Sequence, residues 1–188
     1  MARIKGTAKI KGTAMLNTVK TLRAMREEAI KVLPAELHHY LDQRILVSEW
    51  YPESDQLELL RALVQIVPDQ GMDPWEFMGR FTAQNDLSSL YKTMLREDDP
   101  SGTLRNGALF WQTYHDTGRC TVTLEGESAA MVTLEDYGMP SREMCGILGG
   151  WYGELVRTVG GREVEVGHSQ CVSRGDTSCT WHIKWGQA

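Results

Sequence analysis

The chain has 188 residues, of which 41% are hydrophobic and 24% charged, and its formal net charge is −5 at pH 7. This composition is that of a folded globular domain and excludes a disordered chain. The acidic balance also argues against a general nucleic-acid-binding protein, because neutralising phosphates requires clustered Lys and Arg.

The sequence contains no apolar run near the ~20 residues that a membrane-spanning helix needs. Residues 1–6 lack the apolar core of a signal peptide, so we expect a cytoplasmic protein. In that reducing compartment the 4 cysteines are expected to bind a metal or to be buried rather than to form disulfides.

We divide the chain into a terminal arm over residues 1–14 and a single domain over residues 15–188. The arm repeats the segment Ile-Lys-Gly-Thr-Ala from Ile4 and from Ile10. The arm's basic residues favour a solvated tail, although its β-branched residues could also form a strand. Two copies are too few for a repeat architecture, and the duplication has no functional interpretation. The basic residues are Lys5, Lys9 and Lys11.

Helical patterning dominates the first half of the domain, residues 15–117. Apolar residues recur at three- and four-residue intervals over residues 15–33, and a second helix follows Pro34 over residues 37–45. The helix predicted over residues 57–67 is apolar on most sides, which is typical of a central core helix or of an interface.

The next predicted helix has a clear start, because Asp73 can cap it, Pro74 suits its first position and Glu76 is placed for a capping box. A polar segment at residues 84–86 is expected to interrupt this helix. A last helix of this half ends at Gly118. One of its sides presents Leu104, Ala108, Trp111 and His115.

The pattern changes to alternation in the second half, residues 118–188, which indicates half-buried strands. The predicted fold is therefore α+β: N-terminal helices packed on an antiparallel sheet, with a C-terminal strand–strand–helix–strand–strand unit. The predicted elements are strands over 119–124 and 130–134, a helix opened by Pro140-Ser141 and ended by Gly160-Gly161, and strands over 164–168 and 179–185.

The terminal hairpin brings two cysteines together. A turn centred on Gly175 places Cys171 opposite Cys179, where cross-strand Cβ atoms lie about 4.5–5.5 Å apart. Simple pairing would put the valines of the first strand on the wrong face, and a one-residue β-bulge at residues 169–170 corrects this. His168 then points to the same face as both cysteines.

Cys145 lies on the helix predicted to cover that face and is the candidate fourth ligand. With His168, Cys171 and Cys179 it would form a closed tetrahedral zinc site of the structural type. The alternative is that the cysteines are small buried hydrophobes and that His168 is a satisfied core histidine. Cys120, on the apolar face of its strand, is expected to be buried and unreactive.

We assign no catalytic residue, because the sequence contains no nucleophile elbow, phosphate loop, dinucleotide fingerprint or metalloprotease motif. Gly149-Gly150 falls inside a helix and is best explained by close backbone approach to the sheet or to a ligand. Trp111 and Trp151 are candidates for shaping an apolar pocket. His115 could line that pocket or bind haem, but a satisfied histidine at a helix end is the favoured interpretation.

A resemblance to a known family rests on the C-terminal residues. Cys145, the strand Val164-Glu165-Val166 and the run from Cys171 to Trp181 resemble the end of the 4-vinyl reductase domain family. The pattern there is a helix cysteine, a strand, a cysteine, a Gly-Asp turn and a cysteine before an aromatic residue. The whole chain, with Trp50-Tyr51-Pro52 and the Asp99-Pro100 loop before a helix, further resembles a group of similar length known mainly from myxobacteria.

The resemblance implies the fold of nitric-oxide-signalling sensors and of Golgi-transport (TRAPP-like) adaptor subunits, which is an antiparallel sheet with helices against one face and is commonly dimeric. In the sensor domains of phenol-responsive transcription activators, the cysteines matching Cys145, Cys171 and Cys179 bind zinc with an intervening glutamate. His168 stands at that position here, which keeps a competent ligand but changes the charge of the site. The pocket residues of those sensors have no matching motif in this chain.

These features favour a non-catalytic sensory or regulatory domain, a homodimer with structural zinc that binds a small apolar or aromatic molecule between sheet and helices. The alternative is a structural interaction or scaffold protein, whose helices dimerise and whose surface recruits a protein partner. A third and weaker option is an enzyme acting on a vinyl-bearing tetrapyrrole, as the family name suggests. We expect neither a nucleic-acid partner nor a membrane span.

Overall fold

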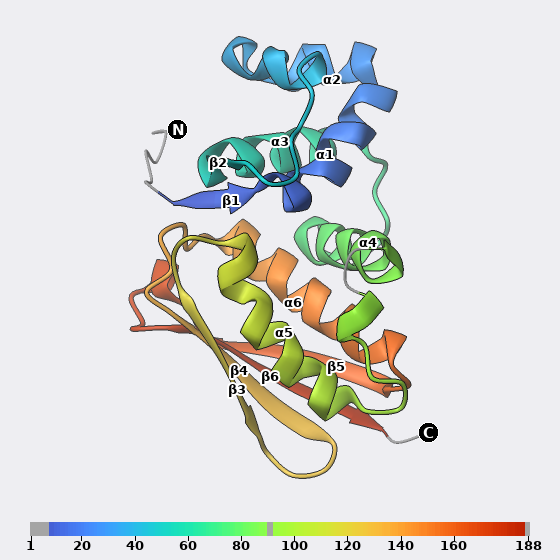
Figure 1. The fold of residues 1–188 in the computed structure, drawn as a ribbon, viewed down its shortest axis with the longest axis vertical. Helices are drawn as coiled ribbons and strands as arrows, with labels where there is room; N and C mark the ends of the chain where they lie inside the picture. The colour runs from blue at the N-terminus through green and yellow to red at the C-terminus, as the bar shows by residue number, and fades with distance from the viewer. Residues whose placement is uncertain (1–7, 90–91, 187–188) are drawn as a thin grey trace.

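The chain forms two lobes that lie end to end along the long axis of the molecule (Figure 1). The structure is a computed structural model that describes residues 8–89 and 92–186. We call residues 8–67 the helical lobe and residues 73–186 the sheet lobe. The helical lobe contains β1 (Lys9–Lys11), α1 (Gly12–Ala24), α2 (Arg26–Val32), the 3₁₀ helix η1 (Ala35–Leu41), β2 (Trp50–Pro52) and α3 (Glu53–Ile66).

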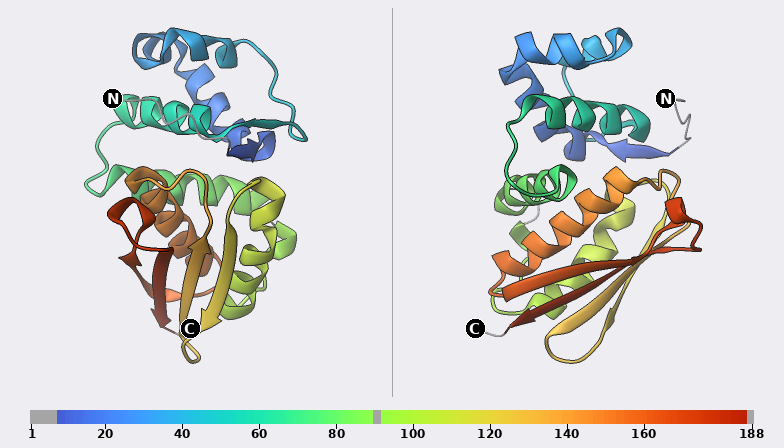
Figure 2. Two further views of the ribbon diagram at one scale, coloured as in Figure 1. Left: turned by 90° about the vertical axis from the view of Figure 1, so that its left-hand side faces the viewer. Right: turned by 180° about the vertical axis from the view of Figure 1, so that it is seen from behind.

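The sheet lobe is built on a 4-stranded antiparallel sheet with the order β3-β4-β6-β5. Helices α5 and α6 lie against one face of this sheet (Figures 1 and 2). The predicted α+β class and the strand–strand–helix–strand–strand order of the second half are confirmed. The elements are α4 (Pro74–Ser89), η2 (Lys92–Met94), α5 (Pro100–Tyr114), β3 (Arg119–Leu124), β4 (Ala129–Glu135), α6 (Arg142–Thr158), β5 (Arg162–Gln170), η3 (Val172–Arg174) and β6 (Cys179–Gly186).

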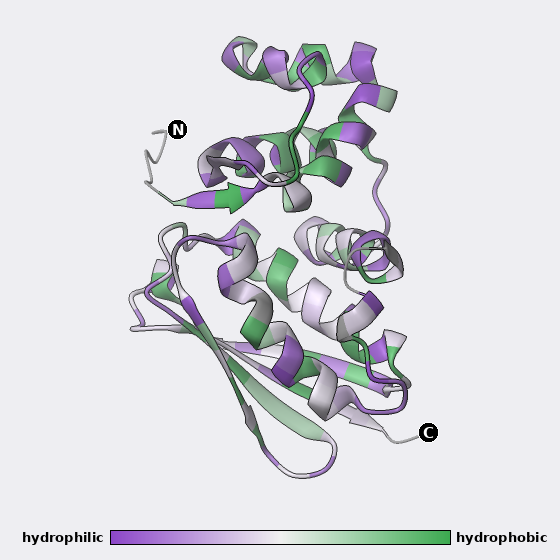
Figure 3. Ribbon diagram, viewed as in Figure 1, coloured by the Kyte–Doolittle hydropathy of each residue, from purple (hydrophilic) through white to green (hydrophobic). Residues whose placement is uncertain are grey.

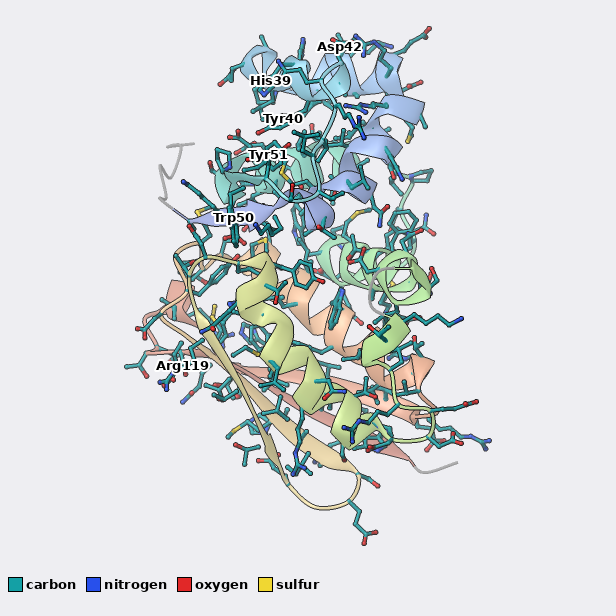
Figure 4. All side chains as sticks on the ribbon, viewed as in Figure 1. His39, Tyr40, Asp42, Trp50, Tyr51 and Arg119 are labelled. Carbon is teal, nitrogen blue, oxygen red and sulfur yellow. The ribbon has the colours of Figure 1, made fainter. Side chains whose placement is uncertain are left out.

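The small sheet of the helical lobe corrects the expected terminal arm. β1 pairs antiparallel with β2, so that Ile10 lies opposite Tyr51, and Ile10 is buried in the core. The Lys11 ammonium lies 4.1 Å from the centre of the Trp50 ring, which Figure 4 labels. Residues 8–14 therefore belong to the fold rather than to a solvated tail. The local sequence pattern could not show this, because the strand that pairs with β1 lies some forty residues away. Residues 1–7 lie outside the described residues.

Two helix predictions were wrong. The helix predicted over residues 37–45 is a short 3₁₀ helix that ends at Leu41. The interruption predicted at residues 84–86 does not occur, since α4 continues to Ser89. The reason lies in Asp86, which turns inward and accepts a hydrogen bond from the Asn17 side chain at 3.0 Å, so a polar residue is accommodated inside the helix packing.

α3 is the central helix of the helical lobe, as its nearly continuous apolar pattern predicted. It buries Leu57, Leu59, Leu60, Ala62 and Leu63, and also the polar side chains Glu53, Asp55 and Gln56 of its first turns. Figure 3 shows hydrophobic and hydrophilic residues mixed along the helices of both lobes. Within the described residues, no helix combines the length and the apolarity needed to cross a membrane.

Glycine allows α6 to lie in close contact with both of its neighbours. A Cβ atom at Gly150 would lie 2.2 Å from the backbone oxygen of Glu76 on α4. A Cβ atom at Gly149 would lie 3.4 Å from the indole nitrogen of Trp181 on the sheet. The glycines therefore serve close helix packing, and α6 is held tightly between α4 and the sheet.

Candidate metal centre and ligand pocket

The four predicted metal ligands converge where the terminal hairpin meets α6. One ligand atom from each of Cys145, His168, Cys171 and Cys179 lies within 4.8 Å of the other three. The Cys145 sulfur is 3.5 Å from the Cys171 sulfur and 3.6 Å from the Cys179 sulfur. All three cysteines are buried, and His168 is half-buried. We call these four residues the Cys₃His cluster.

The register of β5 and β6 produces this convergence. His168 pairs with Trp181 and Gln170 pairs with Thr180, so one residue is skipped between the two pairs. This is the bulge predicted from the sequence, and it is confirmed. Gly175 closes the turn in the left-handed backbone conformation, with φ at 99°, which favours glycine at that position.

Hydrogen bonding makes the sulfurs of the cluster electrostatically unequal. The Cys145 thiol donates to Cys179, which lowers the pKa of Cys179 to about 5 and raises the pKa of Cys145 well above its usual range. Burial lowers the pKa of His168, and the nearby Arg174 lowers it further. Thiolate and neutral imidazole are the forms that bind a metal ion.

The donor set fits zinc. Tetrahedral coordination with Zn–S bonds of about 2.3 Å places sulfurs about 3.8 Å apart, which is close to the two distances measured from Cys145. His168 Nε2 is buried and has no hydrogen-bond partner among the described residues. A buried polar atom of this kind is costly unless a ligand engages it. A zinc ion held here would connect α6 to the hairpin.

Trp181 contacts two residues of the cluster, Cys145 and His168. Its side chain is fully buried, and its indole N–H donates to the Cys145 carbonyl oxygen at 3.2 Å. Its ring stacks on the His168 imidazole with 5.0 Å between the ring centres. The sequence placed Trp181 on the apolar face of its strand but contained no signal for this orienting role, which depends on contacts outside the ligand set.

A cleft opens beside the cluster. It has a volume of about 400 Å³ and is bordered by the first turn of α4, by Arg142 and by Arg174. The cluster residues Cys145, His168 and Cys171 line this cleft, so a small chelator would have a path to an ion held there.

The structure also brings together the three residues predicted for a pocket. Trp111, His115 and Trp151 line one pocket of about 120 Å³ between the two lobes. The helical lobe contributes residues of β1, α1 and α3 to its wall, and the sheet lobe contributes residues of α4, α5 and α6. We call this site the aromatic pocket. It is assembled from elements that are far apart in the sequence.

His115 is held by a buried carboxylate. Its Nδ1 lies 2.9 Å from Glu53 Oε1, and the Tyr137 hydroxyl donates to the same oxygen at 2.5 Å. The His115 ring stacks on Trp111 with 3.9 Å between the ring centres, and Glu53 is fully buried. His115 is thus a satisfied histidine, as favoured from the sequence, but its partner lies on the other lobe.

Two acidic residues of this region were not predicted. Glu53 anchors His115 and Tyr137, and Asp86 lines the aromatic pocket. Burial raises the pKa of Asp86 to about 7, against hydrogen bonds from Asn17 and Trp151 that lower it. The sequence contained no local signal for either residue, because the partners of both lie on distant elements.

Cys120 stands apart from the cluster. It is half-buried on β3, with its sulfur 3.6 Å from the Tyr152 hydroxyl oxygen. Burial raises the pKa of its thiol to about 11, which agrees with the unreactive cysteine expected from the strand pattern.

Comparison with known proteins identifies the fold. No protein-family model matches the sequence, and no curated protein matches it. An H-NOX protein from S. oneidensis in the Fe(II)NO state superposes with a TM-score of 0.67 at 15% identity, over 95% of this chain and 100% of that one. An oxygen-binding H-NOX domain related to soluble guanylate cyclases, in its oxygen complex, gives 0.67 at 13% identity over 95% and 96%.

This chain has the fold of an H-NOX domain. A third structure, solved to probe haem distortion in the H-NOX family, has a TM-score of 0.67 at 13% identity over 95% of this chain and 96% of that chain. At such identities the likeness establishes the fold alone. The predicted relation to nitric-oxide-signalling sensors is thereby confirmed at the level of fold, and the kinship with the 4-vinyl reductase domain family stays a prediction.

The residues of the aromatic pocket do not fit haem, the group whose distortion that third structure probes. Haem needs an axial ligand with a free ring nitrogen and room for the macrocycle. Glu53 engages the Nδ1 atom of His115 and Trp111 covers one face of its ring, which leaves Nε2 as the only candidate axial ligand. The pocket volume of about 120 Å³ is below the ~300–1,000 Å³ usual for organic ligands.

Proposed function

We propose that the chain is a non-catalytic regulatory domain that binds a small molecule and carries structural zinc in the Cys₃His cluster. The observation that carries the proposal is the convergence of four ligand atoms within 4.8 Å. His168 contributes one of them, and its buried Nε2 atom has no hydrogen-bond partner among the described residues. Four protein ligands saturate a tetrahedral zinc ion, so the metal stabilises the fold and performs no chemistry. Kinship with the 4-vinyl reductase domain family and assembly as a homodimer belong to the same proposal.

The aromatic pocket is the ligand site of this proposal. A molecule bound there would contact both lobes at once and would favour the arrangement of lobes that closes around it. The pocket volume of about 120 Å³ is close to that of an engineered cavity of about 150 Å³ that binds benzene or xenon in another protein. The ligand is therefore a small, largely apolar or aromatic molecule.

A scaffold protein is the second candidate, and one surface feature favours it. Leu46, Val47 and Trp50 are 46%, 50% and 37% exposed and lie close together in the sequence before and within β2. An exposed apolar surface of this kind is typical of a protein contact. The tetrapyrrole enzyme has no comparable support, because the aromatic pocket is too small for a tetrapyrrole.

Native mass spectrometry of the purified chain, combined with elemental analysis, tests these alternatives. The proposal expects one zinc per chain, a mass of two chains and a small bound molecule that is lost on denaturation. A chain that is free of metal after expression with added zinc would contradict the zinc proposal. Zinc without a small ligand, together with a dimer that Trp50→Ala disrupts, would favour the scaffold.

A further inference from the structure

We propose that the aromatic pocket selects a small organic cation, either a protonated amine or a quaternary ammonium, with the Asp86 carboxylate as its counter-charge. This inference rests on the proposed function, because it assumes that the pocket is the ligand site. It adds the charge and the chemical class of the ligand. Three observations carry it: the environment of Asp86, the rings around it, and the size of the pocket.

The first observation is a buried carboxylate whose partners are all neutral within the described part of the chain. Asp86 is 8% exposed, lines the pocket and accepts a hydrogen bond from the Asn17 amide at 3.0 Å. Its other hydrogen-bond partner is Trp151. A buried carboxylate is stable only when it is paired with an opposite charge or loses its own. Burial does raise the pKa of Asp86, to about 7.

The second observation is the set of rings that surround this carboxylate. The pocket wall contains Trp111 and Tyr114 from α5 and Trp151 and Tyr152 from α6. Aromatic faces attract cations through the ring quadrupole, and cages of such rings recognise quaternary ammonium groups. A carboxylate together with several rings therefore suits a cation, whereas an anion would meet repulsion from Asp86 and a neutral molecule would leave its charge uncompensated.

The histidine on the pocket wall does not compensate the charge of Asp86. His115 lines the pocket and is already paired with Glu53 at 2.9 Å, so it is not available as the partner of Asp86. The volume of about 120 Å³ limits the ligand to roughly the size of benzene or less. Tetramethylammonium and tert-butylammonium meet this limit.

A matched pair of probes tests the inference by isothermal titration calorimetry on the full zinc-loaded chain. tert-Butylammonium and tert-butanol have nearly the same shape and differ in charge. The cation is expected to bind more tightly than the alcohol by about tenfold or more, because it meets both the carboxylate and the ring faces. Equal affinity for the two probes would overturn the inference.

Two variants locate the bound cation. Asp86→Asn keeps the shape and the Asn17 contact but removes the charge, so the preference for the cation should disappear. The matched control is Asp55→Asn, at another buried carboxylate, which accepts from the Tyr40 hydroxyl at 2.9 Å within the helical lobe; this variant should keep the preference. A preference that survives in Asp86→Asn would sink the proposal.

A third variant tests the site independently, in case Asp86→Asn does not fold. Ala14→Leu fills the pocket from α1 without altering the carboxylate, and it should abolish binding of tert-butylammonium. Binding that persists in Ala14→Leu would mean that the cation sits elsewhere and would overturn the inference. If phenol binds to the wild type and both butyl probes fail, the cation inference fails while the proposed ligand site stands. If phenol also fails, both fail.

Discussion

The Cys₃His cluster and the aromatic pocket lie on opposite sides of α6 and differ in how complete they are. Cys145 and Gly149 face the cluster, whereas Ile147 and Trp151 face the pocket. In the cluster, the Cys145 sulfur contacts the other two sulfurs and the His168 imidazole lies within 4.8 Å of them, so four ligand atoms face one point. The pocket instead contains a carboxylate with neutral partners. The difference teaches that the protein's own side chains can supply every ligand atom of one site, while another site keeps a buried carboxylate without an opposite charge.

The largest expected effect comes from removing a ligand of the cluster. Cys145→Ala should reduce the zinc content from one ion per chain to none and lower the free energy of unfolding by roughly 5 kcal/mol. Structural zinc contributes about 10–16 kcal/mol in isolated zinc-finger peptides, and a domain with its own core depends on it less. Elemental analysis and thermal melting measure the two changes together.

The matched control for this variant is Cys120→Ala on β3. Its sulfur contacts the Tyr152 hydroxyl and lies outside the cluster, so zinc content should stay unchanged. Retention of one zinc in Cys145→Ala would show that α6 is not part of the site. The contrast between a complete cluster and an incomplete pocket would then lose its basis.

The second prediction concerns the pocket and its pH dependence. The pKa of Asp86 rises from 3.8 to about 7 in the fold, so the folded chain holds a proton that the unfolded chain has lost. Stability should therefore fall as pH rises from about 4 to about 7, by at most about 4 kcal/mol. Urea unfolding of wild type and of Asp86→Asn at several pH values measures this loss.

The variant shares the Cys₃His cluster with the wild type, so the difference between their unfolding free energies isolates Asp86. That difference should shift in favour of Asp86→Asn with rising pH. A difference that is independent of pH would mean that Asp86 ionises as freely as in water. The buried charge of Asp86 would then be compensated by groups of the protein itself, and the contrast with the cluster would not hold.

The two regions also differ in how far the sequence could predict them. The cluster follows from short-range rules, because His168, Cys171 and Cys179 lie on one hairpin whose alternation requires a single bulge. Cys145 is on the helix that covers it. Alternation and turn chemistry are local, so the ligand set could be worked out, and the resemblance to the 4-vinyl reductase domain family pointed to the same residues.

The aromatic pocket could be predicted only in part. Trp111, His115 and Trp151 were identified by residue type, but their assembly depends on helices packed from both lobes. Asp86 was assigned to a helix interruption, because a polar segment looks the same in sequence whether it faces solvent or a distant amide such as Asn17. Strand β1 stayed one of two alternatives for the same reason, since its partner is β2.

The third prediction tests the contact that closes the pocket between the lobes. Glu53→Ala removes the acceptor of Tyr137 and His115 and should cost about 3 kcal/mol, because buried donors are left without a partner. Glu58→Ala on the same helix removes a half-buried ion pair with Arg61 at 2.8 Å and should cost about 1 kcal/mol or less. Chemical denaturation measures both. Similar costs would show that the inter-lobe carboxylate of Glu53 contributes no more to stability than the half-buried Glu58.

The smallest effects are expected from alanine substitutions at two glycines, Gly150 on α6 and Gly107 on α5. Gly150→Ala places a Cβ atom 2.2 Å from the Glu76 backbone oxygen and should cost about 1–3 kcal/mol, because backbone cannot yield as a side chain can. Gly107→Ala on α5 places its Cβ atom 3.6 Å from a Leu155 methyl group and should be neutral or stabilising by up to about 1 kcal/mol, since alanine favours helix. Thermal melting ranks the two. If Gly150→Ala were as stable as Gly107→Ala, α4 and α6 would separate without cost. Close packing of α4 on α6 would then not be the reason that Asp86 of α4 lies near Trp151 of α6.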